Sequence, residues 1–69
     1  MHSKLLTVDE LSAYLKIPKP TVYYLAQTGR IPASKVGRHW RFEEKEIRKW
    51  LREQQVAYRN RNREKLGRK

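Results

Sequence analysis

Two short stretches of the sequence gather side chains that bind phosphates and nucleobases. Residues 19–27 combine a lysine with hydroxyl, phenol and amide groups, and residues 35–42 (KVGRHWRF) place basic side chains around two large aromatic rings. Lysine and arginine pair with phosphates and guanine edges, and hydroxyl groups bond phosphates or bases. We therefore expect noncovalent recognition of a nucleic acid. The candidate contacts are Lys19, Pro20, Thr21, Tyr23, Tyr24 and Gln27 in the first stretch, and Lys35, Arg38, His39 and Arg41 in the second.

The overall charge of the chain favours a polyanionic partner. The 69 residues include 17 Lys and Arg against 7 Asp and Glu, a formal net charge of +10. Half of that excess lies in residues 59–69 (RNRNREKLGRK), which contain a single leucine as their apolar side chain. Because such a segment buries little apolar surface, we expect either a frayed helical extension or a disordered basic arm. The candidate nonspecific phosphate contacts in it are Arg59, Arg61 and Arg63, and the alternative is a solvated tail without that role.

The sequence argues against catalysis, metal binding and cofactors. The chain has no cysteine, and its two histidines, His2 and His39, lie far apart in the sequence. Most acidic residues fall where helices are expected to begin, which accounts for them without a catalytic role. The sequence has no glycine-rich phosphate loop and no arrangement of a nucleophile with a base. We therefore expect no enzyme activity, no metal and no cofactor.

The length and the apolar pattern predict one small domain outside the membrane. No apolar run approaches the roughly 20 residues of a membrane span. The N-terminal segment MHSKLLT lacks the apolar stretch of a secretory signal. We therefore expect a cytoplasmic protein without a membrane partner.

A first helix is predicted to begin after Thr7. Thr7 and Glu10 have the spacing of a capping box, in which each side chain accepts a hydrogen bond from a free amide at the helix start. Leu6 and Leu11 are placed to pack across that cap as a hydrophobic staple. The helix is expected to end before Pro18, because the residue that precedes a proline disfavours helical geometry.

A second helix is predicted after a very short turn. Pro20 fits its first turn, and Gly29 suits the left-handed position just past its end. Tyr23 and Tyr24 are adjacent, so they cannot both point into the core, and at least one is expected to be exposed. The alternative for either ring is packing against the first helix or the hairpin, which suits Tyr23 better because it lies nearer the apolar face.

Residues 35–42 predict a β-hairpin around a turn of Gly37, Arg38 and His39, with Gly37 at a position that needs unusual dihedral angles. Since side chains alternate along a strand, we expect Val36, Trp40 and Phe42 to lean on one face, with Trp40 partly exposed near the tip. The basic side chains are then expected on the other face and at the tip, namely Lys35, Arg38, His39 and Arg41.

A third helix is predicted from about residues 43–44, with Ile47, Trp50 and Leu51 on its apolar face. Two short helices joined by a tight turn are typical of a helix-turn-helix, whose second helix enters the major groove of DNA. A small basic hairpin beside that motif is a wing. The expected fold is therefore mainly α with a small β-hairpin: a winged helix-turn-helix of three helices plus a two-stranded wing.

The run from Leu6 to Leu51 resembles the winged helix-turn-helix domain of the phage excisionase family, which is related to the DNA-binding half of MerR-like regulators. The resemblance rests on LTVDELSAYL, PTVYYLAQTGRIPASKVGRHWRF and EIRKWL, and it covers about two thirds of the chain. It implies a non-enzymatic factor of a bacterium or phage that is associated with the nucleoid, bends DNA and helps a separate integrase. The residues that it assigns to DNA contact or its close support are Thr21, Tyr23, Tyr24, Arg38 and Arg41.

Residues 1–58 are expected to form the DNA-binding domain, and residues 59–69 a flexible basic tail. The expected function is sequence-specific binding of double-stranded DNA as an excisionase-type recombination directionality factor, with an integrase or recombinase as partner. The alternatives are a small MerR-like transcriptional regulator and a basic RNA-binding or nucleoid-type protein. We expect a monomer in solution, with several copies binding DNA cooperatively.

Overall fold

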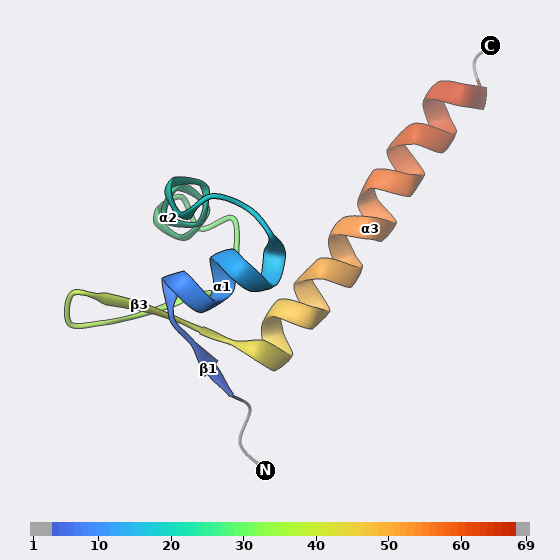
Figure 1. The fold of residues 1–69 in the computed structure, drawn as a ribbon. Coiled ribbons are helices and arrows are strands. Elements are labelled where there is room, and N and C mark those ends of the chain that lie inside the picture. The colour runs from blue at the N-terminus through green and yellow to red at the C-terminus, as the bar shows by residue number, and fades with distance from the viewer. Residues whose placement is uncertain (1–3, 68–69) are drawn as a thin grey trace.

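Three helices and a small sheet make up the described part of the chain (Figure 1). The computed structural model describes the backbone of residues 4–67 and the side chains of residues 4–61. In chain order the elements are β1 (Leu5–Leu6), α1 (Val8–Leu15), α2 (Lys19–Gln27), β2 (Ser34–Val36), β3 (His39–Glu43) and α3 (Glu44–Gly67). The mainly helical fold with a wing is confirmed, and the sheet has one strand more than the sequence predicted.

The sheet is antiparallel with the strand order β1-β3-β2. The additional strand, β1, pairs Leu6 with Phe42 of β3. Beside it, the amide of Glu44 donates a hydrogen bond to the carbonyl of Lys4 over 2.8 Å. A strand of two residues has no periodic pattern, which is why the sequence did not reveal it. Its pairing anchors residues 5–6 to the base of the hairpin.

Helix α1 begins and ends as its local sequence dictates. The predicted capping box is confirmed: the Glu10 amide donates to Thr7 Oγ1 over 3.1 Å, and the Thr7 amide donates to Glu10 Oε1 over 2.9 Å. Lys16 closes the helix in the left-handed conformation, with φ 59°. Ser12 Oγ donates to the carbonyl of Ile17 over 2.6 Å, which fixes the tight turn into α2.

Helix α2 follows after three residues and lies beside α1 (Figure 1). Its first turn holds Pro20, as predicted. After the helix, Gly29 has φ 69°, which confirms the predicted left-handed position. Thr28 Oγ1 donates to the Tyr24 carbonyl over 2.7 Å and satisfies an acceptor at the helix end.

The core lies where the three helices meet the sheet. Four of its side chains, Leu11, Val22, Phe42 and Ile47, are fully buried, and they come from α1, α2, β3 and α3 respectively. The other buried side chains are Leu6, Val8, Ala26 and Ile31. Trp40 and Trp50 pack against this cluster while remaining partly exposed. A core this small makes each of its large side chains matter to stability.

Helix α3 is the longest element of the described chain, with 24 residues. Its first turns pack on the core through Ile47 and Trp50, and its remainder projects away from the rest of the molecule (Figure 1). The backbone of residues 59–67 is helical and continues α3, so of the two expected forms of this segment it has the helical one. The side chain of Arg63 lies outside the described residues. Among residues 4–67, no helix combines the length and apolarity needed to cross a membrane.

Candidate nucleic-acid interface

The outer face of α2 presents two phenol rings to solvent. Tyr23 is 44% exposed and Tyr24 is 52% exposed, whereas Val22 and Ala26 on the opposite face are buried. Both rings therefore lie outside the core, as expected for at least one of them. The other predicted contacts on this helix are also exposed, namely Lys19, Pro20, Thr21 and Gln27.

Tyr24 has a neighbour that the sequence did not predict. The guanidinium carbon of Arg30 lies over its ring, 5.7 Å from the centroid. The Arg30 backbone is held at two points, because its amide donates to the Leu25 carbonyl and its carbonyl accepts from Trp50 Nε1, both over 2.9 Å. Arg30 follows a turn at Gly29, and no helical or strand spacing relates it to Tyr24. It is a further candidate contact beside the tyrosine face.

The hairpin register differs from the prediction. Lys35 pairs with Trp40, and Val36 pairs with His39. Directly paired residues share a face, so Lys35 lies on the side of Trp40, and its predicted place on the opposite face is wrong. Val36 is turned outward instead and is 63% exposed.

The length of the turn explains this error. The prediction treated Gly37, Arg38 and His39 together as the turn, but the chain reverses over Gly37 and Arg38 alone. Gly37 has φ 63°, as expected for glycine at the first central position of a two-residue II′ turn. A shift of one residue moves side chains to the other face of a strand.

The basic side chains of the hairpin are arranged around Trp40. The ammonium of Lys35 lies 5.2 Å from the centroid of the Trp40 ring. Arg41 Nη1 donates to the Trp40 carbonyl over 2.7 Å, which orients the guanidinium. Arg38 and His39 are exposed at the tip, where they were predicted. The tip is therefore cationic and directly accessible to an anion.

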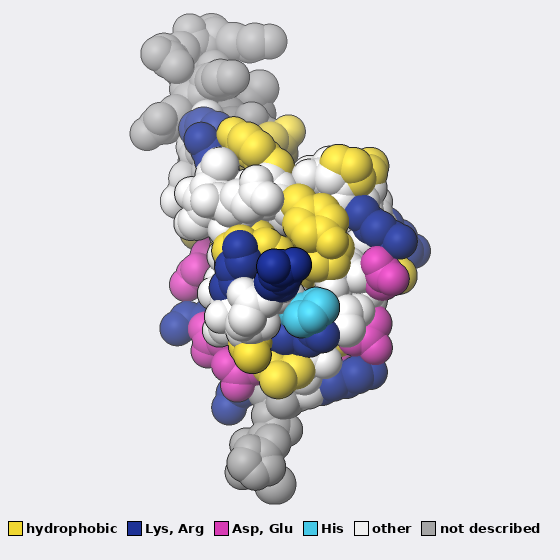
Figure 2. Space-filling view, turned by 90° about the vertical axis from the view of Figure 1, so that its left-hand side faces the viewer, with side chains coloured by type: hydrophobic (Ala, Val, Ile, Leu, Met, Phe, Trp, Pro, Cys, Tyr) yellow, Lys and Arg dark blue, Asp and Glu magenta, His cyan; other side chains and the backbone are white. Residues whose placement is uncertain are grey.

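A polar hollow of about 200 Å³ joins the hairpin to the two helices. Tyr23 of α2 and the start of α1 line it together with four consecutive hairpin residues, Arg38, His39, Trp40 and Arg41. Figure 2 shows this face of the molecule, where the histidine lies among Lys and Arg side chains, next to hydrophobic ones and with acidic ones toward the edges. The structure thus brings three of the four predicted wing contacts, Arg38, His39 and Arg41, together with Tyr23.

An acidic residue also lines this hollow. Asp9, in the first turn of α1, contributes to the wall, and its Oδ1 lies 3.0 Å from Nζ of Lys19. The side chains of Lys19 and Asp9 remain 56% and 74% exposed. The sequence predicted Lys19 as a nucleic-acid contact but not its ion pair, because the two residues belong to different helices.

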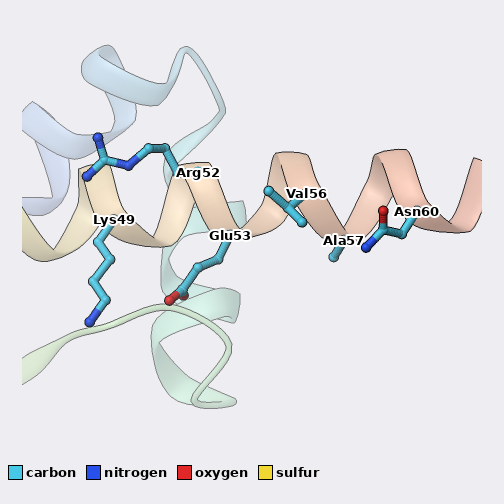
Figure 3. Close-up of a pocket in the computed structure, with 6 residues that line it drawn as sticks. All are labelled: Lys49, Arg52, Glu53, Val56, Ala57 and Asn60. Carbon is cyan, nitrogen blue, oxygen red and sulfur yellow. The ribbon is translucent and has the colours of Figure 1, made fainter.

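A second hollow runs along α3 (Figure 3). It measures about 490 Å³, and its lining residues all belong to that helix: Lys49, Arg52, Glu53, Val56, Ala57 and Asn60. Since no second element closes it, it is an open helix surface. Farther along, Arg59 and Arg61 are exposed on the projecting part of α3. Within the described residues, no group of three or more His, Cys, Asp or Glu side chains could hold a metal ion.

Comparisons with known proteins match the same region. Residues 5–55 match a family described as a helix-turn-helix domain. Two strains of Mycobacterium tuberculosis each have a relative named "Putative DNA-binding protein", 41% identical over 49 residues, which are 71% of this chain and 63% of the relative. An uncharacterized protein of Bacillus subtilis is 39% identical over 44 residues, which are 64% of this chain and 14% of that protein.

The chain thus spans less than two thirds of the length of these relatives. No solved structure shows a significant match to it. The family match begins at β1, includes both short helices and the whole hairpin, and ends within α3. Sequence similarity and geometry therefore agree on the motif, and the chain belongs to the helix-turn-helix domain family.

Proposed function

We propose that this chain binds double-stranded DNA in a sequence-specific manner, with α2 in the major groove and the β2–β3 hairpin against the phosphate backbone. The observation that carries the proposal is the polar hollow in which Tyr23 of α2 meets Arg38, His39 and Arg41 of the hairpin. One continuous surface can then contact base edges and phosphates together. The helix-turn-helix family and the names of the Mycobacterium relatives support the same partner.

The exposed face of α2 is proposed to read the bases. In a helix-turn-helix the N-terminal residues of the second helix lie nearest the base edges. Lys19 and Thr21 occupy that end, and Tyr24 follows one turn later with Arg30 over its ring. Lysine donates to guanine O6 and N7, while an aromatic ring contacts the thymine methyl group. These chemistries discriminate between base pairs, whereas charge alone does not.

The hairpin is proposed to hold the backbone. Arg38 and His39 are exposed at its tip, and Arg41 is oriented by its bond to the Trp40 carbonyl. Arginine presents a planar fork of donors that suits a phosphate. Lys35 lies beside the Trp40 ring, so it approaches the backbone from the other side of the hairpin.

The proposed biological role is that of an excisionase-type recombination directionality factor, which binds and bends DNA beside a separate integrase. Two observations support this role: residues 6–51 resemble the winged helix-turn-helix domain of the excisionase family, and the chain has a net charge of +10. A single small module buries only about 600–1,000 Å² on DNA. We therefore propose that the free protein is a monomer and that several copies bind neighbouring sites cooperatively. A tight dimer without DNA in analytical ultracentrifugation would contradict this.

A small transcriptional regulator would use the same contacts, and the location of the DNA site separates the two roles. Footprinting should protect phage attachment DNA if the chain directs excision. Protection of promoter DNA alone would favour the regulator.

Selection of duplexes from a random pool tests the proposed function directly. An enriched sequence should bind more tightly than a scrambled duplex of equal composition, and both duplexes should outcompete RNA of equal length. Tyr24→Ala should weaken binding to the enriched duplex about 10-fold, which corresponds to about 1.4 kcal/mol. Tyr58→Ala is the matched control, because Tyr58 is 62% exposed on α3. No enrichment, a preference for RNA, or equal effects of the two variants would overturn the proposal.

A further inference from the structure

We propose that Asp9 is a selectivity residue of the DNA-binding surface: it holds Lys19 by an ion pair and lowers affinity for nonspecific duplex more than for the cognate sequence. This inference rests on the proposed function. It concerns a negative charge at a surface that is otherwise proposed to attract phosphates.

The geometry places Asp9 between the two parts of the interface. Its Oδ1 lies 3.0 Å from Nζ of Lys19, at the N-terminal end of α2. It also lines the polar hollow with Arg38, His39 and Arg41 of the hairpin. A DNA backbone that approached these cations would pass close to the carboxylate.

Folding accounts for Asp9 only in part. An acid in the first turn of a helix is stabilised by the helix dipole by about 0.3–1 kcal/mol at an exposed position, and α1 also has Glu10 there. The ion pair joins two largely exposed side chains, and exposed pairs of this kind contribute little to stability. The carboxylate therefore matters more to what approaches the surface than to the fold.

The electrostatic effect differs between the two classes of DNA. Nonspecific binding is almost entirely a matter of phosphate contacts. Asp9 opposes it twice, because it repels phosphate and because a phosphate must compete with it for Lys19. At a cognate site the same ion pair holds the Lys19 ammonium at one place near the start of α2, where it faces a base edge. The orienting effect there offsets the repulsion.

The test compares Asp9→Asn with Glu53→Gln, which makes the same change in charge at an exposed position on α3. The probes are the enriched duplex and its scrambled counterpart, each titrated at several salt concentrations. Asp9→Asn should raise affinity for the scrambled duplex about 5-fold at 50 mM salt and leave affinity for the enriched duplex within about 2-fold. One added phosphate contact steepens the slope of log affinity against log salt by about 0.9. The gain in affinity for the scrambled duplex should therefore be about 3.5-fold smaller at 200 mM salt than at 50 mM.

Two further variants separate the ion pair from general charge. Asp9→Glu should keep the parental ratio of specific to nonspecific affinity, since the charge remains. In a Lys19→Gln background, Asp9→Asn should no longer change that ratio. Thermal unfolding of each variant checks that the fold is intact. Lys19→Gln alone is a second test, because it should also lower the ratio of specific to nonspecific affinity.

The inference fails if Asp9→Asn and Glu53→Gln raise affinity for the enriched and the scrambled duplex equally. It also fails if Asp9→Asn still changes the ratio of specific to nonspecific affinity in the Lys19→Gln background. Either result leaves sequence-specific binding of the parent chain in place. Absence of any enriched duplex would instead remove the proposed function. The two failures are therefore distinguishable.

Discussion

The indole Nε1 of Trp50 donates a hydrogen bond to the backbone carbonyl of Arg30 over 2.9 Å. The two residues lie 20 positions apart, and the bond joins α3 to the segment that follows α2. The guanidinium of the same Arg30 lies over the ring of Tyr24 on the exposed face of α2. Helix α3 thus helps to hold the segment that supports the proposed recognition surface.

Replacing Trp50 with phenylalanine tests that link. Trp50→Phe keeps an aromatic ring against the core but removes the donor to Arg30. We expect a loss of about 0.5–1.5 kcal/mol in the free energy of unfolding from the lost hydrogen bond, measured by urea denaturation. The resonances of the Tyr24 ring should also shift, because the Arg30 backbone loses one of its two hydrogen bonds. Tyr58→Phe on the exposed part of α3 should change stability by less than about 0.5 kcal/mol.

The observed hairpin register predicts opposite outcomes at two apolar positions. Val36→Thr should change the free energy of unfolding by less than about 0.5 kcal/mol, because Val36 is 63% exposed. Phe42→Ala should cost about 3–5 kcal/mol, because Phe42 is fully buried and pairs with Leu6. That cost approaches the whole stability of so small a core, so this variant should be largely unfolded at 25 °C. A large cost at Val36 would contradict the register.

Gly37 should be sensitive to the handedness of its replacement. A Cβ at this position meets no atom within 4 Å, so the φ of 63° is the source of strain. We expect Gly37→Ala to cost about 1–2 kcal/mol of folding free energy. A synthetic chain with D-alanine there should be at least as stable as the parent, because the D-residue favours positive φ. Equal losses for both enantiomers in thermal unfolding would show that space, and not backbone conformation, limits this turn.

The projecting part of α3 should contribute affinity without sequence discrimination. The double variant of Arg59→Gln and Arg61→Gln removes two exposed cations. If each contacts one phosphate, the slope of log affinity against log salt should fall by about 1.8. Binding to enriched and scrambled duplexes should weaken by the same factor. An unchanged slope would show that these arginines lie away from the bound DNA.

Several features of this fold were predictable because they are local. The capping box of Thr7 and Glu10 satisfies amides within one helical turn, so its spacing alone identifies it. Pro20 lies in the first turn of α2 because its fixed φ suits a helix start, and Gly29 adopts positive φ after the helix because it has no Cβ. The apolar spacing of the helices and the aromatic pair of the hairpin were enough to indicate the winged arrangement.

The remaining features depend on contacts between separate elements. Strand β1 exists because Leu6 pairs with Phe42, a partner far along the chain. The hairpin register follows from a turn one residue shorter than the sequence suggested, which moved Lys35 to the side of Trp40. The ion pair of Lys19 with Asp9 joins two helices, and no local sequence pattern predicts it. Contacts of this kind, between separate elements, determine the arrangement of the interface.

Chemical-shift mapping of the amide resonances during titration with the enriched duplex tests the central claim most directly. We predict that the largest changes fall on the outer face of α2 and on the hairpin, with Thr21, Tyr24, Arg38 and His39 among the most affected. Changes confined to residues 59–69, with α2 and the hairpin unaltered, would contradict the account.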